Sequence, residues 1–186
     1  VEAQAPNRTK AEVLRSSNAA YAAIQRQDYV TALTILRELA AQGVVWAQSN
    51  LGKLYNSGQG VPQDYKEAAR LYGLAAAQGD AEAQYNLGVM YDNGQGVAQD
   101  YKEAVRLYRL AAAQGNAKAQ SNLGTMYDFG TGVAQDYVRA HMWYNLGAIS
   151  GEKDNKAPAN RDDIAKRMTP QQLAVFASRA FGTPLL

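Results

Sequence analysis

The sequence predicts an all-α fold, a solenoid of antiparallel helix pairs, and three observations support this class. A block of sequence recurs every 36 residues, so that Gly52, Gly88 and Gly124 take the same place in successive copies. Each copy contains two stretches in which apolar residues return every three or four positions, as in amphipathic helices. A fixed period of this length is typical of stacked repeats. We therefore expect one continuous repeat domain over residues 1–186.

The repeat divides the chain into five helix pairs. The first pair, residues 8–43, has a connecting segment two residues shorter than the others. Three repeats follow at residues 44–79, 80–115 and 116–151. Residues 152–186 no longer follow the pattern, and we expect them to form helices that cap the exposed apolar end of the array.

The first pair is expected to contain one helix from Thr9 to about Arg26 and a second from Tyr29 to Ala41. Asp28 stands at the N-cap of the second helix, where its carboxylate can accept a main-chain N–H. Leu14 and Ala23 lie on the predicted apolar side of the first helix.

The middle repeat shows the expected course of each copy. Asp80 is placed to cap a first helix, here called helix A, that runs to about Asp92. Gly94 follows at the point where a left-handed residue commonly ends a helix. Val97 is the one apolar residue of the loop, and we expect it to fill the gap between the two helices of the repeat.

The second helix of the repeat, helix B, is predicted from Tyr101 to Ala113 with Asp100 as its N-cap. Glu103 lies three residues after the cap, and Asp64 with Glu67 repeats this spacing. The spacing predicts a capping box, in which the glutamate side chain bonds back to the main-chain N–H of the cap.

Each helix A carries a glycine in its interior, although glycine there costs about 1 kcal/mol relative to alanine. Its recurrence at Gly52, Gly88 and Gly124 predicts that a neighbouring helix passes too close for a methyl group. Ala104 and Tyr108 supply the small residue and the ring that such a close crossing needs on helix B.

The C-terminal segment is predicted to begin with a loop, residues 152–160, because this stretch is polar and contains Pro158. A short helix is expected from Arg161 to Met168, and a last helix ends near Phe181. The start signal of the last helix is a cap, a proline and a glutamine, namely Thr169, Pro170 and Gln172. The residues expected to point inward on it are Leu173, Phe176 and Ala180.

Composition excludes several classes of protein. The chain has no cysteine and one histidine, His141, which rules out disulfides, a thiol nucleophile and cysteine-containing zinc sites. The formal charge is +2 with basic residues spread through the chain, so we expect no nucleic-acid partner. No apolar run approaches the roughly 20 residues of a membrane span.

No catalytic motif emerges from the sequence. The pairs Gly58/Gly60 and Gly94/Gly96 follow a helix and lack the third glycine of a dinucleotide fingerprint. The run 92–94 lacks the spacing of a calcium loop. His141 has no partnered nucleophile, so we expect it to pack or to lie at the surface. We expect no catalytic residue, no metal, no cofactor and no enzymatic activity.

The best functional candidate is the face of each helix A opposite its expected core, which includes Ser49 and Asp128. An asparagine recurs there, and its amide offers donors and an acceptor to an extended peptide backbone. An apolar anchor from Tyr85 and Val89 would stand within this polar face. The alternative is that the amides brace neighbouring A helices. The proposed partner-binding residues are Asn50, Lys53, Tyr85, Asn86, Val89, Asn122 and Thr125.

Over residues 44–151 the repeating string resembles the Sel1-like repeat. The residues that carry the resemblance in the middle copy are Ala83, Leu87, Gly88, Tyr91, Gly94, Gly96, Val97, Asp100, Ala104, Tyr108, Ala112 and Gly115. The shorter first pair resembles a tetratricopeptide repeat. The resemblance implies a right-handed α/α superhelix whose A helices line a concave groove. It also implies an adaptor role, and many bacterial members are exported.

We therefore expect a non-catalytic scaffold or adaptor, a monomer, that binds a protein or peptide in its concave groove. One alternative is a cell-envelope enzyme acting on peptidoglycan or β-lactams; the cysteine-rich members linked to β-lactam binding do not extend to this cysteine-free chain. Another is a self-associating structural component. The start Val-Glu-Ala, without Met, favours a periplasmic or secreted protein, with a trimmed cytoplasmic chain as the alternative.

Overall fold

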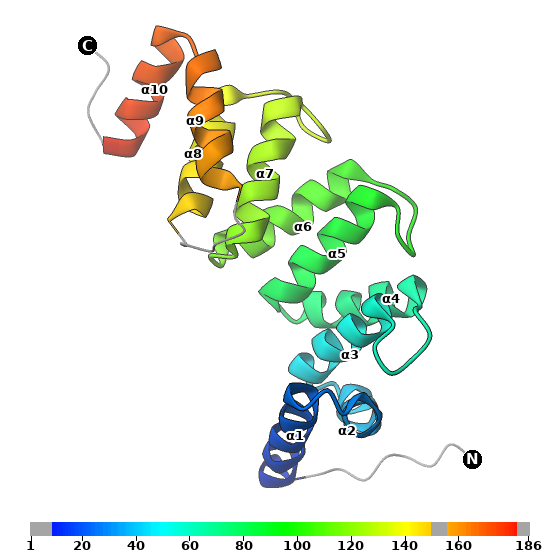
Figure 1. Cartoon of the computed structure of the whole chain (residues 1–186). Helices are drawn as coiled ribbons and strands as arrows, with labels where there is room; N and C mark the ends of the chain where they lie inside the picture. The colour runs from blue at the N-terminus through cyan, green and yellow to red at the C-terminus, as the bar shows by residue number, and fades with distance from the viewer. Residues whose placement is uncertain (1–8, 150–155, 182–186) are drawn as a thin grey trace. The chain divides into compact units, whose positions relative to one another are not determined.

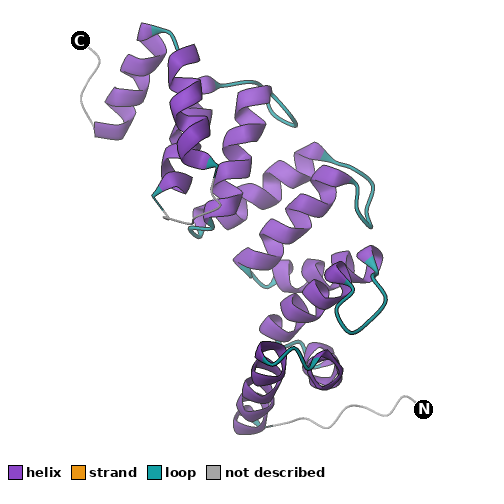
Figure 2. Cartoon of the chain, in the orientation of Figure 1, coloured by secondary structure: helices purple, strands orange, loops and turns teal. Residues whose placement is uncertain are grey.

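The computed structural model describes residues 9–149 and 156–181, and all regular elements in these two ranges are α-helices (Figure 2). The chain divides into two compact units, one up to Gln99 and one from Asp100. The helices of the first unit are α1 (Lys10–Gln25), α2 (Tyr29–Ala41), α3 (Val45–Ser57), α4 (Tyr65–Ala77) and α5 (Ala81–Asn93) (Figure 1). Those of the second are α6 (Tyr101–Ala113), α7 (Ala117–Phe129), α8 (Tyr137–Ala148), α9 (Ala157–Arg167) and α10 (Pro170–Phe181).

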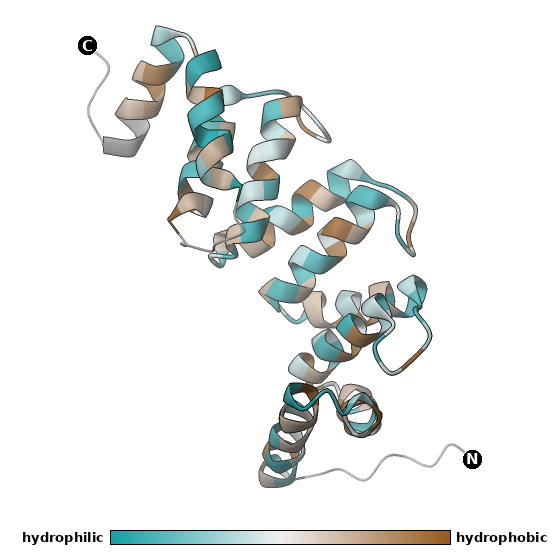
Figure 3. Ribbon diagram, in the orientation of Figure 1, coloured by the Kyte–Doolittle hydropathy of each residue, from teal (hydrophilic) through white to brown (hydrophobic). Residues whose placement is uncertain are grey.

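Consecutive helices pack against one another from α1 to α5 and from α6 to α9, as the prediction of an all-α array of helix pairs requires, whereas α10 packs on α8. In the first unit a continuous core of small and aliphatic side chains, including Ala20, Leu36 and Leu51, runs from α1 to α4. Most helices carry both hydrophilic and hydrophobic residues, consistent with packing along one side (Figure 3). Leu14 of α1 was expected on the apolar side, but it is 62% exposed.

The predicted ends of the glycine-terminated helices are confirmed. Gly58, Gly94 and Gly130 each follow the last residue of a helix A, with φ of 70°, 67° and 70°. A glutamine of the following loop then donates to a carbonyl in the last turn of the same helix A, over 2.7 Å in each repeat. The bonds are Gln63 to Asn56, Gln99 to Asp92 and Gln135 to Asp128.

The capping aspartates are confirmed, but the capping boxes of the B helices are not. Asp64 accepts the N–H groups of Lys66 and Glu67. The Glu67 carboxylate, however, pairs with Arg70 at 2.7 and 2.8 Å and not with the cap. The reason is that the N–H of Asp64 already donates to the carbonyl of Tyr55 at 3.0 Å, so the glutamate has no donor to satisfy there. Glu103 likewise pairs with Arg106 of its own helix.

The second glycine of each loop allows a close approach to the preceding helix B. A Cβ atom at Gly60 would lie 2.5 Å from the Cβ of Tyr29, and one at Gly132 would lie 2.5 Å from the carbonyl oxygen of Tyr101. At Gly96 it would collide with the carbonyl group of Tyr65. Each loop therefore rests on the first turn of the helix B that precedes it within the same unit.

The interior glycines of the A helices are explained by an aromatic ring. A methyl group at Gly52 would lie 3.0 Å from the ring of Tyr72, and one at Gly124 would lie 2.6 Å from the ring of Tyr144. The predicted close crossing is confirmed at these two positions. The group that excludes the methyl is the buried tyrosine ring of the paired helix B.

The C-terminal helices differ from the expectation at two points, the start of α9 and the exposure of Leu173. Helix α9 begins at Ala157, so Pro158 lies in its first turn, where a missing N–H leaves no bond unmade. The capping box of α10 is confirmed, because Thr169 and Gln172 exchange hydrogen bonds of 2.8 and 3.2 Å. Leu173 was expected to point inward but is 40% exposed. The side chain of Ala180 and residues 152–155 lie outside the described part of the chain.

Candidate functional site

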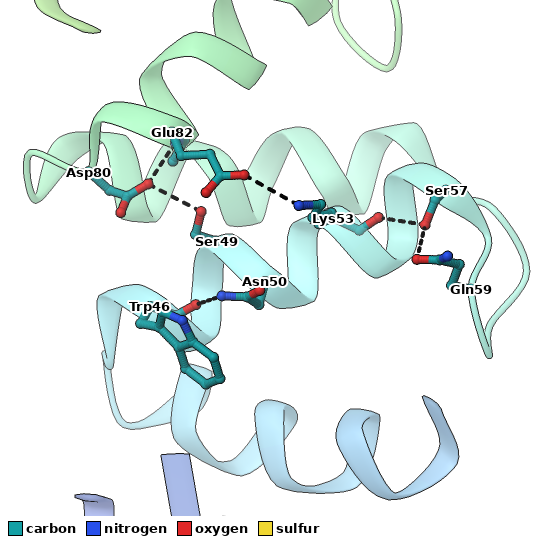
Figure 4. A network of polar contacts seen from close by, with 9 residues as sticks. Trp46, Ser49, Asn50, Lys53, Ser57, Gln59, Asp80 and Glu82 are labelled. Carbon is teal, nitrogen blue, oxygen red and sulfur yellow. Dashed lines mark hydrogen bonds and ion pairs between the residues drawn. The ribbon is translucent and has the colours of Figure 1, made fainter. Parts of the chain in front are cut away.

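Two polar contacts join the A helices α3 and α5 of the first unit (Figure 4). The hydroxyl of Ser49 donates to the carboxylate of Asp80 at 3.2 Å, and Lys53 Nζ lies 3.4 Å from Glu82. Ser49 is only 6% exposed, so the expectation that it faces solvent is wrong. These contacts hold the first turn of α5 against the middle of α3.

The repeated asparagines do not brace the neighbouring A helix. The amide of Asn50 donates to the carbonyl of Trp46 in its own helix at 2.8 Å (Figure 4). Within the described residues, the side chains of Asn86 and Asn122 make no hydrogen bond, and both are partly exposed. The bracing contact is the one between Ser49 and Asp80. The Asn86 and Asn122 amides are therefore available to a ligand.

The predicted apolar anchor lies on the same helix as Asn86. Tyr85 and Val89 of α5 are both partly exposed, and Lys53 of α3 is exposed. The first unit thus presents a polar surface with two apolar side chains on it. We call Asn50, Lys53, Tyr85, Asn86 and Val89 the α3–α5 surface.

The remaining two predicted residues, Asn122 and Thr125, lie on α7 in the second unit. The Thr125 hydroxyl donates to the carbonyl of Ser121 at 3.2 Å and lies 3.1 Å from the hydroxyl of Tyr144, so its one donor is used within the unit. Asp128 of the same helix was expected to face solvent, but it is 5% exposed.

The buried Asp128 is paired with Arg167 of α9, whose Nη1 lies 2.9 Å from the carboxylate. Burial raises the pKa of Asp128, and Arg167 opposes this rise. Arg167 also donates to the hydroxyl of Tyr137 at 3.1 Å and lies over its ring. The role of Asp128 is therefore to hold the C-terminal helix α9 on the last repeat.

His141 of α8 is a packing residue. Its ring meets the edge of Phe176 of α10 at a centroid distance of 4.3 Å, and its Nδ1 has no hydrogen-bond partner among the described residues. Burial lowers its pKa. Arg161 and Asp162 of α9 are close enough to act on this pKa in opposite directions, but no hydrogen bond joins His141 Nδ1 to either of them.

Residues 9–149 and 156–181 lack two further kinds of functional feature. No group of three or more histidine, aspartate or glutamate side chains is arranged to hold a metal ion there. None of the helices in this part of the chain has the length and apolar character to cross a membrane.

One repeated pair was missed from the sequence. Arg37 donates to the hydroxyl of Tyr55 at 3.1 Å, and Arg109 donates to that of Tyr127 at 2.6 Å, in each case 18 residues away. The constant separation is the signal that the sequence offers. The corresponding residue of the copy between them is Gly73, so the arginine that would pair with Tyr91 is missing and the pattern is interrupted.

Paired helices on a 36-residue period, with left-handed glycines ending each helix A, define an all-α repeat protein of the solenoid class. The Sel1 repeat model matches residues 47–80, 81–116 and 117–152, more than half of the chain. The chain belongs to the Sel1 repeat family. Repeats of this family typically mediate protein–protein interaction and are generally non-catalytic.

Similar solved structures support the assignment of this chain to the Sel1 repeat family. A Sel1 repeat protein from Oxalobacter formigenes is 29% identical with a TM-score of 0.69, and the match covers 90% of this chain and 78% of that one. The Escherichia coli protein c5321, a protective antigen of uropathogenic strains displaying an SLR fold, is 33% identical with a TM-score of 0.68. The match covers 95% of this chain but only 38% of c5321.

The MamA protein shares the fold at 17% identity and a TM-score of 0.54, over 94% of this chain and 97% of that one. A search of curated proteins found no match.

Proposed function

We propose that this chain is a non-catalytic adaptor that binds an extended peptide segment of a partner protein on the α3–α5 surface. The observation that carries the proposal is the side chain of Asn86, a partly exposed amide without a hydrogen bond in the described part of the chain. Asparagine is a poor helix former, so its place in the middle of α5 brings no gain in stability. An amide offers two donors and one acceptor, which match the N–H and C=O groups of a peptide.

The surroundings of Asn86 fit the same role. Tyr85 and Val89 lie within one turn of it on α5 and offer apolar contact area at a polar surface. Few residues of an interface carry most of its binding energy, and tyrosine is enriched among them. Both α3 and α5 pack on α4, and the hydroxyl of Ser49 bonds to Asp80 at the start of α5, which supports a surface whose parts are in place before a ligand binds.

Site-specific photo-crosslinking tests the proposal. A benzophenone amino acid at Val89 should capture a discrete partner from extract, whereas the same group at Lys66, an exposed residue of α4, should not. The variant Asn86→Ala should reduce the captured amount while its melting temperature stays within about 2 °C of the wild type, because surface substitutions seldom change stability by more than about 0.5 kcal/mol. Equal capture from both positions, or a large loss of stability in Asn86→Ala, would contradict the proposal.

A further inference from the structure

A cavity of about 540 Å³ lies between α2 and α4 of the first unit, with side chains of α3 on its third side. Its volume falls in the range of roughly 300–1,000 Å³ that is usual for ligand sites in proteins. The cavity is lined by residues of the B helices α2 and α4, together with Gln48, Leu51 and Tyr55 of α3. None of the residues of the α3–α5 surface lines it.

The cavity carries one guanidinium group that is not neutralised. Arg37 is exposed, donates to the hydroxyl of Tyr55 at 3.1 Å and forms no ion pair with any described residue. Arg70, on the opposite wall, is paired with Glu67. The two arginines and one glutamate leave a net charge of +1, so the cavity suits a ligand with a single negative charge and disfavours a dianionic phosphate.

Apolar groups lie one helical turn from these charges. Ala41 is four residues after Arg37 on α2, and Leu74 is four residues after Arg70 on α4, so each pair shares one helix face. Leu74 is 42% exposed, whereas Leu51, which also lines the cavity, is buried. The ligand should therefore carry an apolar side chain close to its negative charge.

We propose that this cavity binds the C-terminal residue of a partner peptide, with its carboxylate on Arg37 and the Tyr55 hydroxyl and an aliphatic side chain against Leu51 and Leu74. A terminal residue carries both groups on one Cα. In an extended segment, by contrast, neighbouring acidic and apolar side chains point to opposite sides and cannot enter one cavity together. Carboxylates are the anions that the planar guanidinium group binds with two parallel hydrogen bonds.

The second unit provides a matched control. There Arg109 and Arg139 both donate to the hydroxyl of Tyr127, which is buried, and both lie over its ring. The variant Arg109→Gln thus removes the same charge and the same kind of arginine–tyrosine bond as Arg37→Gln, but in the other unit.

The test is a titration of the purified protein with defined acetylated hexapeptides, followed by fluorescence anisotropy or NMR. The probe ends in Ser-Ala-Leu with a free carboxylate; a second peptide is its C-terminal amide, and a third is an amide with Glu before the final Leu. The free-acid peptide should bind at least about tenfold more tightly than both amides, because a hydrogen bond to a charged group is strong enough for that ratio.

Arg37→Gln should weaken binding of the free-acid peptide by about tenfold or more, and Arg109→Gln should leave it unchanged. Ala41→Trp provides a second variant: residue 41 is exposed at the end of α2, so an indole there occupies the cavity while the helix core stays intact. It should abolish binding.

Three outcomes would overturn the proposal: no binding of the free-acid peptide at millimolar concentration, equal binding of either amide, or unchanged binding by Arg37→Gln. Asn86→Ala should bind this peptide as the wild type does, so the two proposed sites can fail independently.

Discussion

The side chain of Gln120 donates a hydrogen bond from Nε2 to the main-chain carbonyl of Ala112, 3.1 Å away and eight residues earlier. The acceptor lies in the last turn of a helix B, where carbonyl groups lack partners within the helix. The same bond joins Gln48 to Ala40 and Gln84 to Ala76, at 3.3 and 3.2 Å. Each Sel1 repeat is therefore tied by its first helix to the end of the helix that precedes it in the chain.

Replacing this glutamine should lower stability by about 0.5–1.5 kcal/mol, the usual net value of one hydrogen bond. Gln120→Met keeps a similar volume and removes the donor, while the Ala112 carbonyl retains the N–H of Gly115 at 3.0 Å. Lys118→Met on the exposed side of the same helix is the matched control and should change the free energy of unfolding by less than about 0.5 kcal/mol. Chemical denaturation measures both values, and equal effects would show that the bond contributes nothing.

Alanine should have opposite effects at two helical glycines. At Gly124 the new methyl group would lie 2.6 Å from the Tyr144 ring, so Gly124→Ala should destabilise the fold by about 1–3 kcal/mol through overpacking. At Gly73 no atom lies within 4 Å of the added group, so Gly73→Ala should stabilise it by about 0.5–1 kcal/mol through helix propensity. Melting temperatures that move in the same direction for both variants would contradict this account.

Acidification should weaken the packing of His141 against α10. Because burial lowers its pKa in the folded protein, the neutral form is favoured and the unfolded chain binds the extra proton more readily. Its contribution is complete above the unfolded pKa of 6.5 and declines as the pH falls below that value towards the folded pKa.

Unfolding free energies of the wild type and His141→Leu, measured at about pH 7.5 and about pH 5.5, test this dependence. The wild type should lose more stability between the two values than the variant does. An identical pH dependence in both proteins would assign the loss to other groups.

The ion pair between Asp128 and Arg167 should respond unequally to removal of its two members. Arg167→Met leaves a buried carboxylate without a counter-charge, whereas Asp128→Asn leaves a neutral amide and a cation that can reach solvent. The first variant should therefore unfold at a lower denaturant concentration than the second. In Arg167→Met, the amides of α9 should exchange with solvent faster than they do in the wild type. Equal protection of α9 in the two proteins would argue against this role of the ion pair.

Most of the fold could be predicted because its signals are local. The 36-residue period, the capping aspartates and the glycines after each helix A are read directly from the sequence, and α2 and α6 have the predicted boundaries. The capping boxes failed for a tertiary reason. The cap N–H of Asp64 is taken by Tyr55, which belongs to another helix and is brought there by the loop.

The candidate site could be predicted only in part, because the faces of a single helix do not reveal what packs on them. Ser49 and Asp128 were assigned to the solvent side by their angular position. Both are buried and bonded to residues further along the chain, Asp80 at the N-cap of α5 and Arg167 of α9. The cavity beside Arg37 is formed by α2, α3 and α4 together, and no single stretch of sequence indicates it.

The loops that rest on the preceding helix B set a rule for engineering longer or shorter arrays. The second glycine of each loop lies against Tyr29, Tyr65 or Tyr101. An insertion into one of these loops would therefore disturb its packing on the preceding repeat, although surface loops usually tolerate insertions. Extra copies should instead be spliced after Gly79 or Gly115, where an added side chain would meet nothing within 4 Å. New repeats can therefore be added at the junction between two repeats, and not within the loop that joins helix A to helix B.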